Sequence, residues 1–126
     1  MGRYLGEMRR VMKKDGAVCI STLNLKKNLK PGQPYDKMPH HDKEFLPSEF
    51  QDLLKSYFNE VTVYGLYPTL PHAFFERLKK SGLVKGLPRG LNPVSWFYDR
   101  ITTDDFRWEK RSDLDGCIDL LAVCRN

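Results

Sequence analysis

Four polar residues near the end of a short apolar segment are the first candidates for a site. Thr22 and Asn24 close that segment, and His40 and His41 lie in the polar stretch that follows. Imidazole titrates near neutral pH, and hydroxyl and amide groups exchange hydrogen bonds, so this set could bind a small polar substrate. The alternative is that the histidines are exposed and inert and that Asn24 starts a turn. The four are candidate substrate-binding residues, and none is assigned a catalytic role.

The remaining reactive side chains form no metal or disulfide pattern. The chain has three cysteines, Cys19, Cys117 and Cys124, and no Cys-x-x-Cys pair. We expect all three to be reduced and buried, since a free cysteine packs like a small apolar residue. The acidic residues near position 105 have no histidine or cysteine at ligand spacing, so no metal site is expected.

The composition is that of an ordinary soluble domain. The 126 residues are 40% hydrophobic and 29% charged, and no apolar run approaches the ~20 residues that cross a bilayer. The charged N-terminus does not resemble a signal peptide, so a cytoplasmic protein without a membrane span is predicted. The formal net charge is +5, but the basic residues fall in separate clusters without flanking aromatics. Solvated helix faces explain them better than a nucleic-acid partner does.

Hydrophobic periodicity places the candidate residues at the end of a helix–strand unit. Apolar residues at helical spacing predict a helix over residues 3–14, and a short apolar run predicts a strand over residues 17–22. Residues 26–44 are rich in Lys, Pro, Gly and Asn and predict a long loop. Long loops in compact domains are commonly functional, which favours a substrate-facing position for the histidines.

Two further strands complete the predicted sheet, and a helix precedes the first of them. An apolar stripe predicts a helix over residues 47–58, with Pro47 in its first turn, and strict alternation predicts a strand over residues 60–65. Residues 117–124 form a nearly continuous apolar run that predicts a buried strand, broken by Asp119.

The residues between these last two strands predict a helical insertion. It spans about residues 66–116, with short helices over 72–81 and 93–101 and a polar surface loop over 104–115. An aromatic cluster in and beside it could cover a hydrophobic acceptor, but packing of the insertion's own core is favoured. The cluster consists of Tyr64, Tyr67, Phe74, Phe75, Trp96, Phe97 and Tyr98.

Two motifs resemble the C-terminal half of class I S-adenosylmethionine-dependent methyltransferases. Residues 7–16 read EMRRVMKKDG and lead through an apolar run to T-x-N at 22–24, similar to the family's E-x-x-R-V-L-K-P-G-G segment and following strand. Residues 41–50 read HDKEFLPSEF, similar to the family's H-x-x-x-F-[ST]-P-E-E-[LF]. The chain departs from these patterns at Met12, Lys14, Asp15 and Leu46. The resemblance covers nearly the whole chain except the insertion.

The resemblance implies a partial Rossmann-like α/β fold. Residues 1–126 would form the C-terminal half of a methyltransferase domain, with strands five, seven and six in that order and the last strand antiparallel to its neighbours. The implied parent activity is methyl transfer from S-adenosylmethionine to a small-molecule acceptor, with the loop and the insertion shaping the acceptor pocket. His41 matches the family's spacing to Phe45.

No segment of the sequence fits the cofactor. The Gly-x-Gly-x-Gly turn with which such enzymes approach it is absent, and the resemblance implies that the cofactor strands precede this chain. S-adenosylmethionine is therefore not expected to bind the chain alone, and the isolated chain is expected to be inactive. The missing half would come from a longer reading frame or a partner.

A non-enzymatic alternative is a remnant that serves as an interaction or dimerisation module. Without preceding strands, residues 17–22 would form an exposed edge, which invites pairing into a homodimer.

Overall fold

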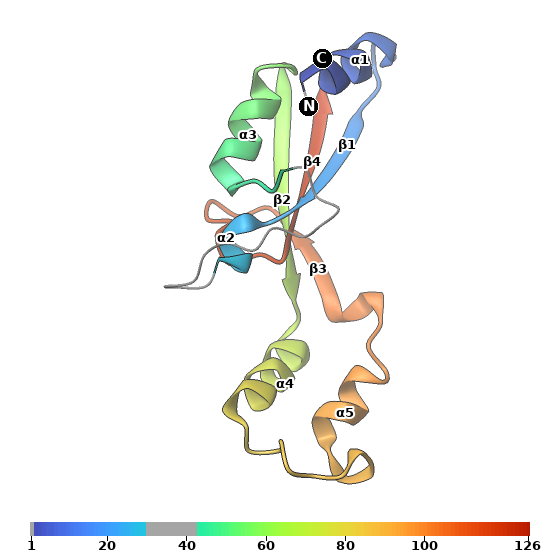
Figure 1. Ribbon diagram of the computed structural model, residues 1–126. Coiled ribbons are helices and arrows are strands. Elements are labelled where there is room, and N and C mark those ends of the chain that lie inside the picture. The colour runs from blue at the N-terminus through green and yellow to red at the C-terminus, as the bar shows by residue number, and fades with distance from the viewer. Residues whose placement is uncertain (1, 30–42) are drawn as a thin grey trace. The chain divides into compact units, whose positions relative to one another are not determined.

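An open four-stranded sheet with flanking helices forms the framework of the chain (Figure 1). The computed structural model describes residues 2–29 and 43–126. The sheet order is β1-β4-β2-β3, and β4 runs antiparallel to both β1 and β2. The strands are β1 (Val18–Leu23), β2 (Glu60–Pro68), β3 (Phe106–Glu109) and β4 (Asp119–Arg125). The predicted α/β class is confirmed.

The chain divides into two compact units, which are described separately. The sheet unit comprises Met1–Leu66 and Trp108–Asn126, and the helical unit comprises Tyr67–Arg107. The helical unit therefore lies inside the stretch in which the sequence predicts an insertion.

The register of the sheet separates a buried face from a partly exposed one. Ala122 of β4 stands opposite Ile20 of β1 and Val63 of β2, and it is fully buried, as are Leu120 and Cys124 on the same face. Residues of the opposite face are half-buried or exposed along all three strands. Because side chains alternate along a strand, the two faces meet different surroundings. The sheet unit thus has its core on one side of the sheet.

Helix α3 (Pro47–Lys55) packs against β4. Its residues Phe50 and Leu54 are each about 1% exposed, which confirms the apolar stripe predicted for this helix. Pro47 occupies the first turn, where its missing N–H costs nothing, and the Leu46 N–H donates to Oε2 of Glu49 at 3.3 Å. The helix ends at Lys55 rather than at residue 58, because the Ser56 hydroxyl donates to the Leu53 carbonyl and closes the last turn.

The N-terminal helix α1 (Gly2–Val11) buries a single residue, Leu5. It is shorter than the predicted helix over residues 3–14. The Gly16 N–H donates to the Lys13 carbonyl at 2.9 Å, so the chain turns here instead of continuing the helix.

Two elements contradict loops expected from the sequence. Helix α2 (Leu25–Asn28) occupies the beginning of the predicted loop over residues 26–44, because the Asn24 side chain caps it. Strand β3 lies inside the predicted polar loop over residues 104–115. Its charged residues Arg107 and Glu109 conceal the apolar residues Phe106 and Trp108, which the periodicity analysis therefore missed.

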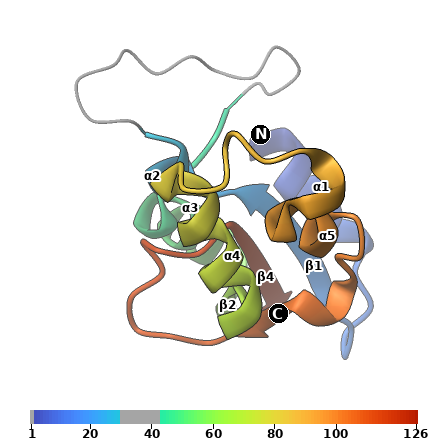
Figure 2. The same ribbon diagram turned by 90° about the horizontal axis from the view of Figure 1, so that it is seen from below.

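The helical unit consists of α4 (Leu70–Ser81), α5 (Pro93–Tyr98) and two short 3₁₀ turns, Arg89–Leu91 and Thr103–Asp105. Helices α4 and α5 lie side by side within it (Figure 2). Asn92 caps α5 by accepting hydrogen bonds from the N–H groups of the first turn.

An aromatic cluster forms the core of the helical unit. The Phe75 and Phe97 rings stack with centroids 4.4 Å apart, and the buried His72 ring lies against Phe97, Tyr98 and Phe106. Core packing is therefore correct for part of the predicted aromatic cluster. It is wrong for two members of that cluster, which are more than half exposed: Phe74 and Trp96.

The three cysteines differ in their burial. Cys117 and Cys124 are fully buried as expected, whereas Cys19 is exposed. Cys19 lies on the edge strand β1 and on the partly exposed face, so nothing in the described sheet covers it. The expectation that all three pack in the core is wrong for this residue.

Candidate functional site

The structure places two of the four predicted site residues. Thr22 lies near the end of β1 and is half-buried, and Asn24 follows the strand and is fully buried. The predicted residues His40 and His41 lie outside the described residues.

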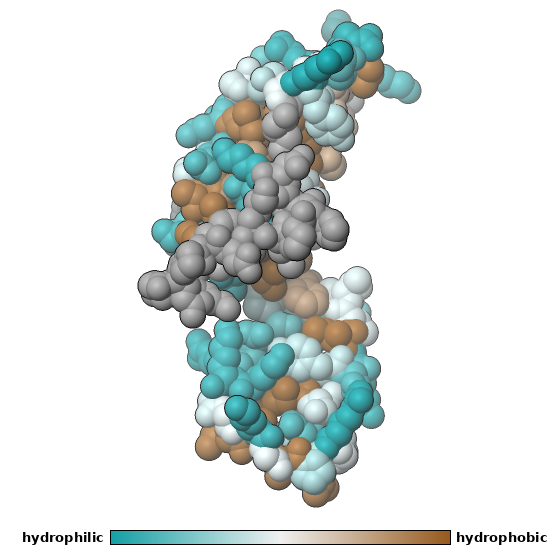
Figure 3. Space-filling view, in the orientation of Figure 1, coloured by the Kyte–Doolittle hydropathy of each residue, from teal (hydrophilic) through white to brown (hydrophobic). Residues whose placement is uncertain are grey.

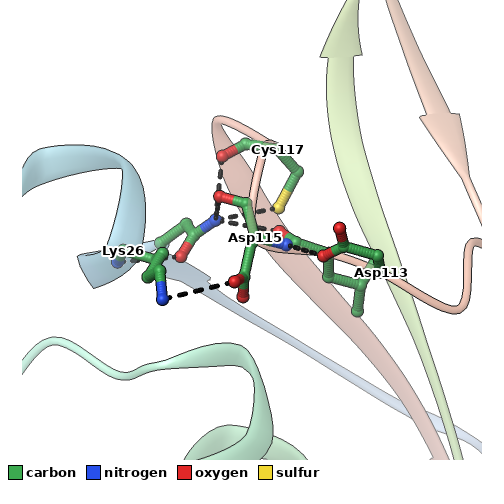
Figure 4. A network of polar contacts seen from close by, with 6 residues as sticks. Lys26, Asp113, Asp115 and Cys117 are labelled. Atoms are coloured by element: carbon green, nitrogen blue, oxygen red, sulfur yellow. Dashed lines mark hydrogen bonds and ion pairs between the residues drawn. The ribbon is translucent and has the colours of Figure 1, made fainter.

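Asn24 connects the end of β1 to the segment that precedes β4 through hydrogen bonds to Leu114 and Cys117. Figure 4 shows this region with Lys26, Asp115 and Cys117 labelled. Its Nδ2 lies 3.0 Å from the Leu114 carbonyl oxygen and 2.9 Å from that of Cys117, while its Oδ1 accepts the Lys26 N–H at 3.0 Å. A buried amide needs such partners because leaving it unpaired is costly. Capping, the alternative raised from the sequence, accounts for Oδ1 of Asn24, and the hydrogen bonds to Leu114 and Cys117 account for its Nδ2. A role toward a substrate stays a prediction.

The side chains around Asn24 do not provide a reactive nucleophile. Burial raises the pKa of the Cys117 thiol, and the contact of Asn24 Nδ2 with Sγ at 3.3 Å opposes that shift. The thiolate is therefore scarce at neutral pH, and the thiolate is the reactive form. Lys26 and Asp115 form an ion pair at 3.3 Å whose side chains are half exposed, so it contributes little.

A pocket of about 310 Å³ lies in the sheet unit, where β1 ends and β4 begins. Leu23 and Asp119 stand opposite each other in the β1–β4 register at this point. The pocket is lined by Ser21, Thr22, Leu23, Trp108 and Asp119. It brings the predicted residue Thr22 together with residues almost one hundred positions later in the chain.

Asp119 gives the pocket its chemistry. Its Oδ1 is buried and has no hydrogen-bond partner among the described residues. Burial raises the pKa of the Asp119 carboxyl, because removing it from water disfavours the charged form. A ligand that brings an N–H or O–H group would supply the missing donor and relieve that cost. The pocket is therefore suited to a small molecule with a hydrogen-bond donor.

The neighbours of Asp119 add two further kinds of contact. Ser21 lies on the same face of the sheet as Asp119, and its hydroxyl can both donate and accept hydrogen bonds, whereas Thr22 pairs with Leu120 on the opposite face. The Trp108 side chain is 44% exposed and offers an indole face to an apolar or cationic group. The set can orient a ligand that has one polar end and one flat or apolar end.

Sequence reasoning missed Ser21, Leu23, Trp108 and Asp119 as pocket residues. One signal was visible, since Asp119 interrupts an otherwise apolar strand, and an acidic group there needs a reason. No comparable signal marked Trp108, because its strand was predicted as a loop. Only the register of the sheet brings these residues together.

The helical unit has a pocket of about 290 Å³ in which three of the six lining residues are aromatic. The Arg100 guanidinium lies 5.9 Å from the centroid of the Trp96 ring. The pocket contains none of the predicted site residues. Its lining consists of Phe75, Pro93, Trp96, Phe97, Arg100 and Asp105.

Residues 2–29 and 43–126 contain neither a cluster of metal ligands nor a membrane-spanning helix. No three His, Cys, Asp or Glu side chains in these ranges gather as they would around a metal ion. No helix in them has the length and apolar character to cross a membrane.

Comparison with known proteins adds no relative from which a role could be transferred. The pocket residues of the chain itself must therefore carry the functional argument. No family model, no curated protein and no solved structure matches this chain.

Proposed function

We propose that this chain is the C-terminal part of an S-adenosylmethionine-dependent methyltransferase and that the pocket beside Asp119 receives the methyl acceptor. The order β1-β4-β2, with β4 antiparallel to both neighbours, supports the proposal, because the sequence resemblance implies this order for strands five, seven and six. The pocket lies at the carboxyl end of β1, and ligands of open α/β sheets gather outside the carboxyl ends of strands. That position is the observation on which the proposal rests.

The acceptor side of the reaction follows from the pocket residues. An acceptor O–H or N–H group donates to the carboxylate of Asp119, whose raised pKa makes it a better base than an ordinary aspartate. Ser21, on the same face as Asp119, orients the polar end of the acceptor, and Trp108 covers its apolar part. Catalysis by such a site is mainly alignment of the acceptor. The chain's residues do not fit the cofactor, since no glycine-rich turn is present.

The experiment compares this chain with a longer product. Isothermal titration calorimetry of the 126-residue chain with S-adenosylmethionine should show no binding, and the purified chain should show no turnover. A protein translated from the same gene together with the in-frame DNA upstream of Met1 should bind S-adenosylhomocysteine. If that DNA encodes no glycine-rich strand–turn–helix segment and no separate protein restores binding, the enzymatic proposal fails.

The second candidate function is an interaction module that forms a homodimer. Strand β1 stands at one edge of the described sheet, and an edge strand offers backbone groups for pairing with another chain. A two-fold axis that joins two β1 strands would close the assembly. This candidate requires self-association of the isolated chain, whereas the methyltransferase proposal does not.

A further inference from the structure

The segment that joins α4 to α5 carries a short repeat, and we call residues 82–91 the tip segment. A glycine followed by a leucine occurs three times, at 82–83, 86–87 and 90–91, and a basic residue separates each pair from the next. Leucine and a cation therefore alternate along the segment. Neither functional candidate explains this pattern.

The leucines of the tip segment are exposed rather than packed. Leu83 is 80% exposed and Leu91 is 72% exposed, and Leu87 is also exposed. Single exposed leucines are common on protein surfaces, but three exposed leucines within ten residues need an explanation. Space-filling colours show apolar side chains at the surface of the helical unit (Figure 3).

The tip segment has ordered turns that hold the leucines outward. The Lys85 N–H donates to the Gly82 carbonyl at 3.0 Å, and the Leu91 N–H donates to the Pro88 carbonyl at 2.9 Å. The Asn92 side chain donates to the Val84 carbonyl at 3.1 Å. Gly82 has φ +74°, a left-handed conformation that a side chain would strain. Backbone groups paired in this way can enter a poorly hydrated environment at lower cost.

The charge around the leucines is positive. Residues 77–98 contain no Asp or Glu, and they contain five basic residues: Arg77, Lys79, Lys80, Lys85 and Arg89. Lys80 pairs with Glu76 and Arg89 with Asp99, both outside this range. These ion pairs are on the surface and weak, so the cations remain available to another anion.

We propose that the tip segment docks onto the surface of a lipid bilayer that contains anionic lipids. The three leucines enter the boundary between headgroups and acyl chains, and the surrounding lysines and arginines contact the anionic headgroups. Interfacial segments combine apolar and basic residues in this way. A nucleic acid would use the cations but would leave three exposed leucines without a role. The inference does not depend on methyl transfer or on dimerisation.

The test is cosedimentation of the full chain with lipid vesicles. One set of vesicles contains phosphatidylcholine alone, and in the other set phosphatidylglycerol replaces part of it. The chain should pellet with the anionic vesicles, bind the neutral ones much more weakly, and lose binding as salt concentration rises. The triple variant Leu83→Ser, Leu87→Ser, Leu91→Ser should bind the anionic vesicles at least about tenfold more weakly.

A matched control removes exposed apolar side chains elsewhere. Tyr4, Val11 and Leu70 are more than half exposed and lie outside the tip segment. Their triple serine variant should bind the vesicles like the wild type. Circular dichroism melting curves should be similar for both triple variants, since no buried residue is changed.

A second measurement locates the inserted segment. With Trp96 and Trp108 replaced by Phe, a single indole is introduced as Leu87→Trp or, in a separate protein, as Leu70→Trp. Anionic vesicles should shift the emission of the Leu87→Trp protein to the blue and leave that of the Leu70→Trp protein unchanged. Wild-type protein that ignores both vesicle types, a tip variant that binds normally, or equal blue shifts would each overturn the inference. Binding to single-stranded DNA without binding to vesicles would also overturn it.

Discussion

The environment of Asp119 differs from that of an ordinary surface aspartate. Its buried Oδ1 has no described hydrogen-bond partner, and burial raises its carboxyl pKa above the ordinary value of 3.8. Replacement by Asn keeps the shape and removes the charge. Asp119→Asn should therefore unfold at higher urea concentration at pH 7. The gain is limited to about 1 kcal/mol, because the residue as a whole is only half-buried and its carboxylate keeps part of its hydration.

The pH dependence of that gain follows from linkage. A carboxyl whose pKa is raised on folding binds its proton more tightly in the folded state, so folding is favoured at low pH and this contribution is lost as pH rises above 3.8. The stability difference between wild type and Asp119→Asn should grow from near zero at pH 3 to its full value at pH 7. A difference that stays constant over this range would show that Asp119 finds a partner in solution.

At the scale of single elements, α3 is the best-defined helix of the sheet unit. Leu54→Ala should destabilise the protein by about 2–5 kcal/mol, since the residue is 1% exposed and its truncation leaves a cavity against the sheet. Urea unfolding measures the loss. The control Leu70→Ala, at a residue 87% exposed, should change stability by less than about 0.5 kcal/mol. Equal effects at both positions would mean that α3 does not pack as described.

Edge strand β1 offers a direct test of the dimer candidate. Cys19 is exposed on this strand, so Cys19→Lys places a charge at the edge without removing core volume. Lysines on edge strands oppose pairing between copies. If the chain dimerises through β1, sedimentation equilibrium should show a shift toward monomer for Cys19→Lys and none for the control Leu70→Lys. A wild-type monomer at micromolar concentration would exclude this candidate.

Elements with a clear hydrophobic periodicity in their own residues were predicted from the sequence. Elements that depend on pairing with residues far away in the chain were not. The stripe with Phe50 and Leu54 marked α3, and the apolar run around Leu120 marked β4. Strand β3 was missed because its alternation of Phe106 and Trp108 with two charged residues covers only four residues within a polar stretch, and its pairing with β2 is not visible in the local sequence.

The candidate site shows the same division. Thr22 was identified from its position at the end of a strand, which is local information. Asp119 and Trp108 became pocket residues only through the sheet order and the register, which no local pattern encodes. The roles suggested for His40, His41 and Asn24 rested on turn chemistry and motif spacing, and a substrate-binding role for them stays a prediction.

At the scale of the whole molecule, the two ends of the helical unit lie next to each other. The Thr69 N–H donates to the Asp105 carbonyl at 2.9 Å, so the two ends of the intervening segment are adjacent. Replacing residues 70–104 by a short Gly-Ser turn should therefore leave a folded sheet unit, because short linkers close such gaps at low entropic cost. Cooperative urea unfolding, and an indole N–H resonance of Trp108 shifted away from its position in the unfolded chain, would verify this. A shortened chain that is unfolded would show that the sheet requires the helical unit.

Because one thiol of the sheet is buried and another is exposed, thiol reactivity can measure how fast the strands separate. Burial raises the pKa of the Cys124 thiol to about 11, and β4, on which it lies, is held by strands on both sides. Cys19 lies exposed on the edge strand. In native buffer, iodoacetamide should modify Cys19 within minutes, while Cys124 should react only at the rate at which the strands separate. Mass spectrometry of the two peptides over time would thus give the rate of strand separation from Cys124, with the exposed thiol of Cys19 in the same molecule as the internal reference for unhindered reaction.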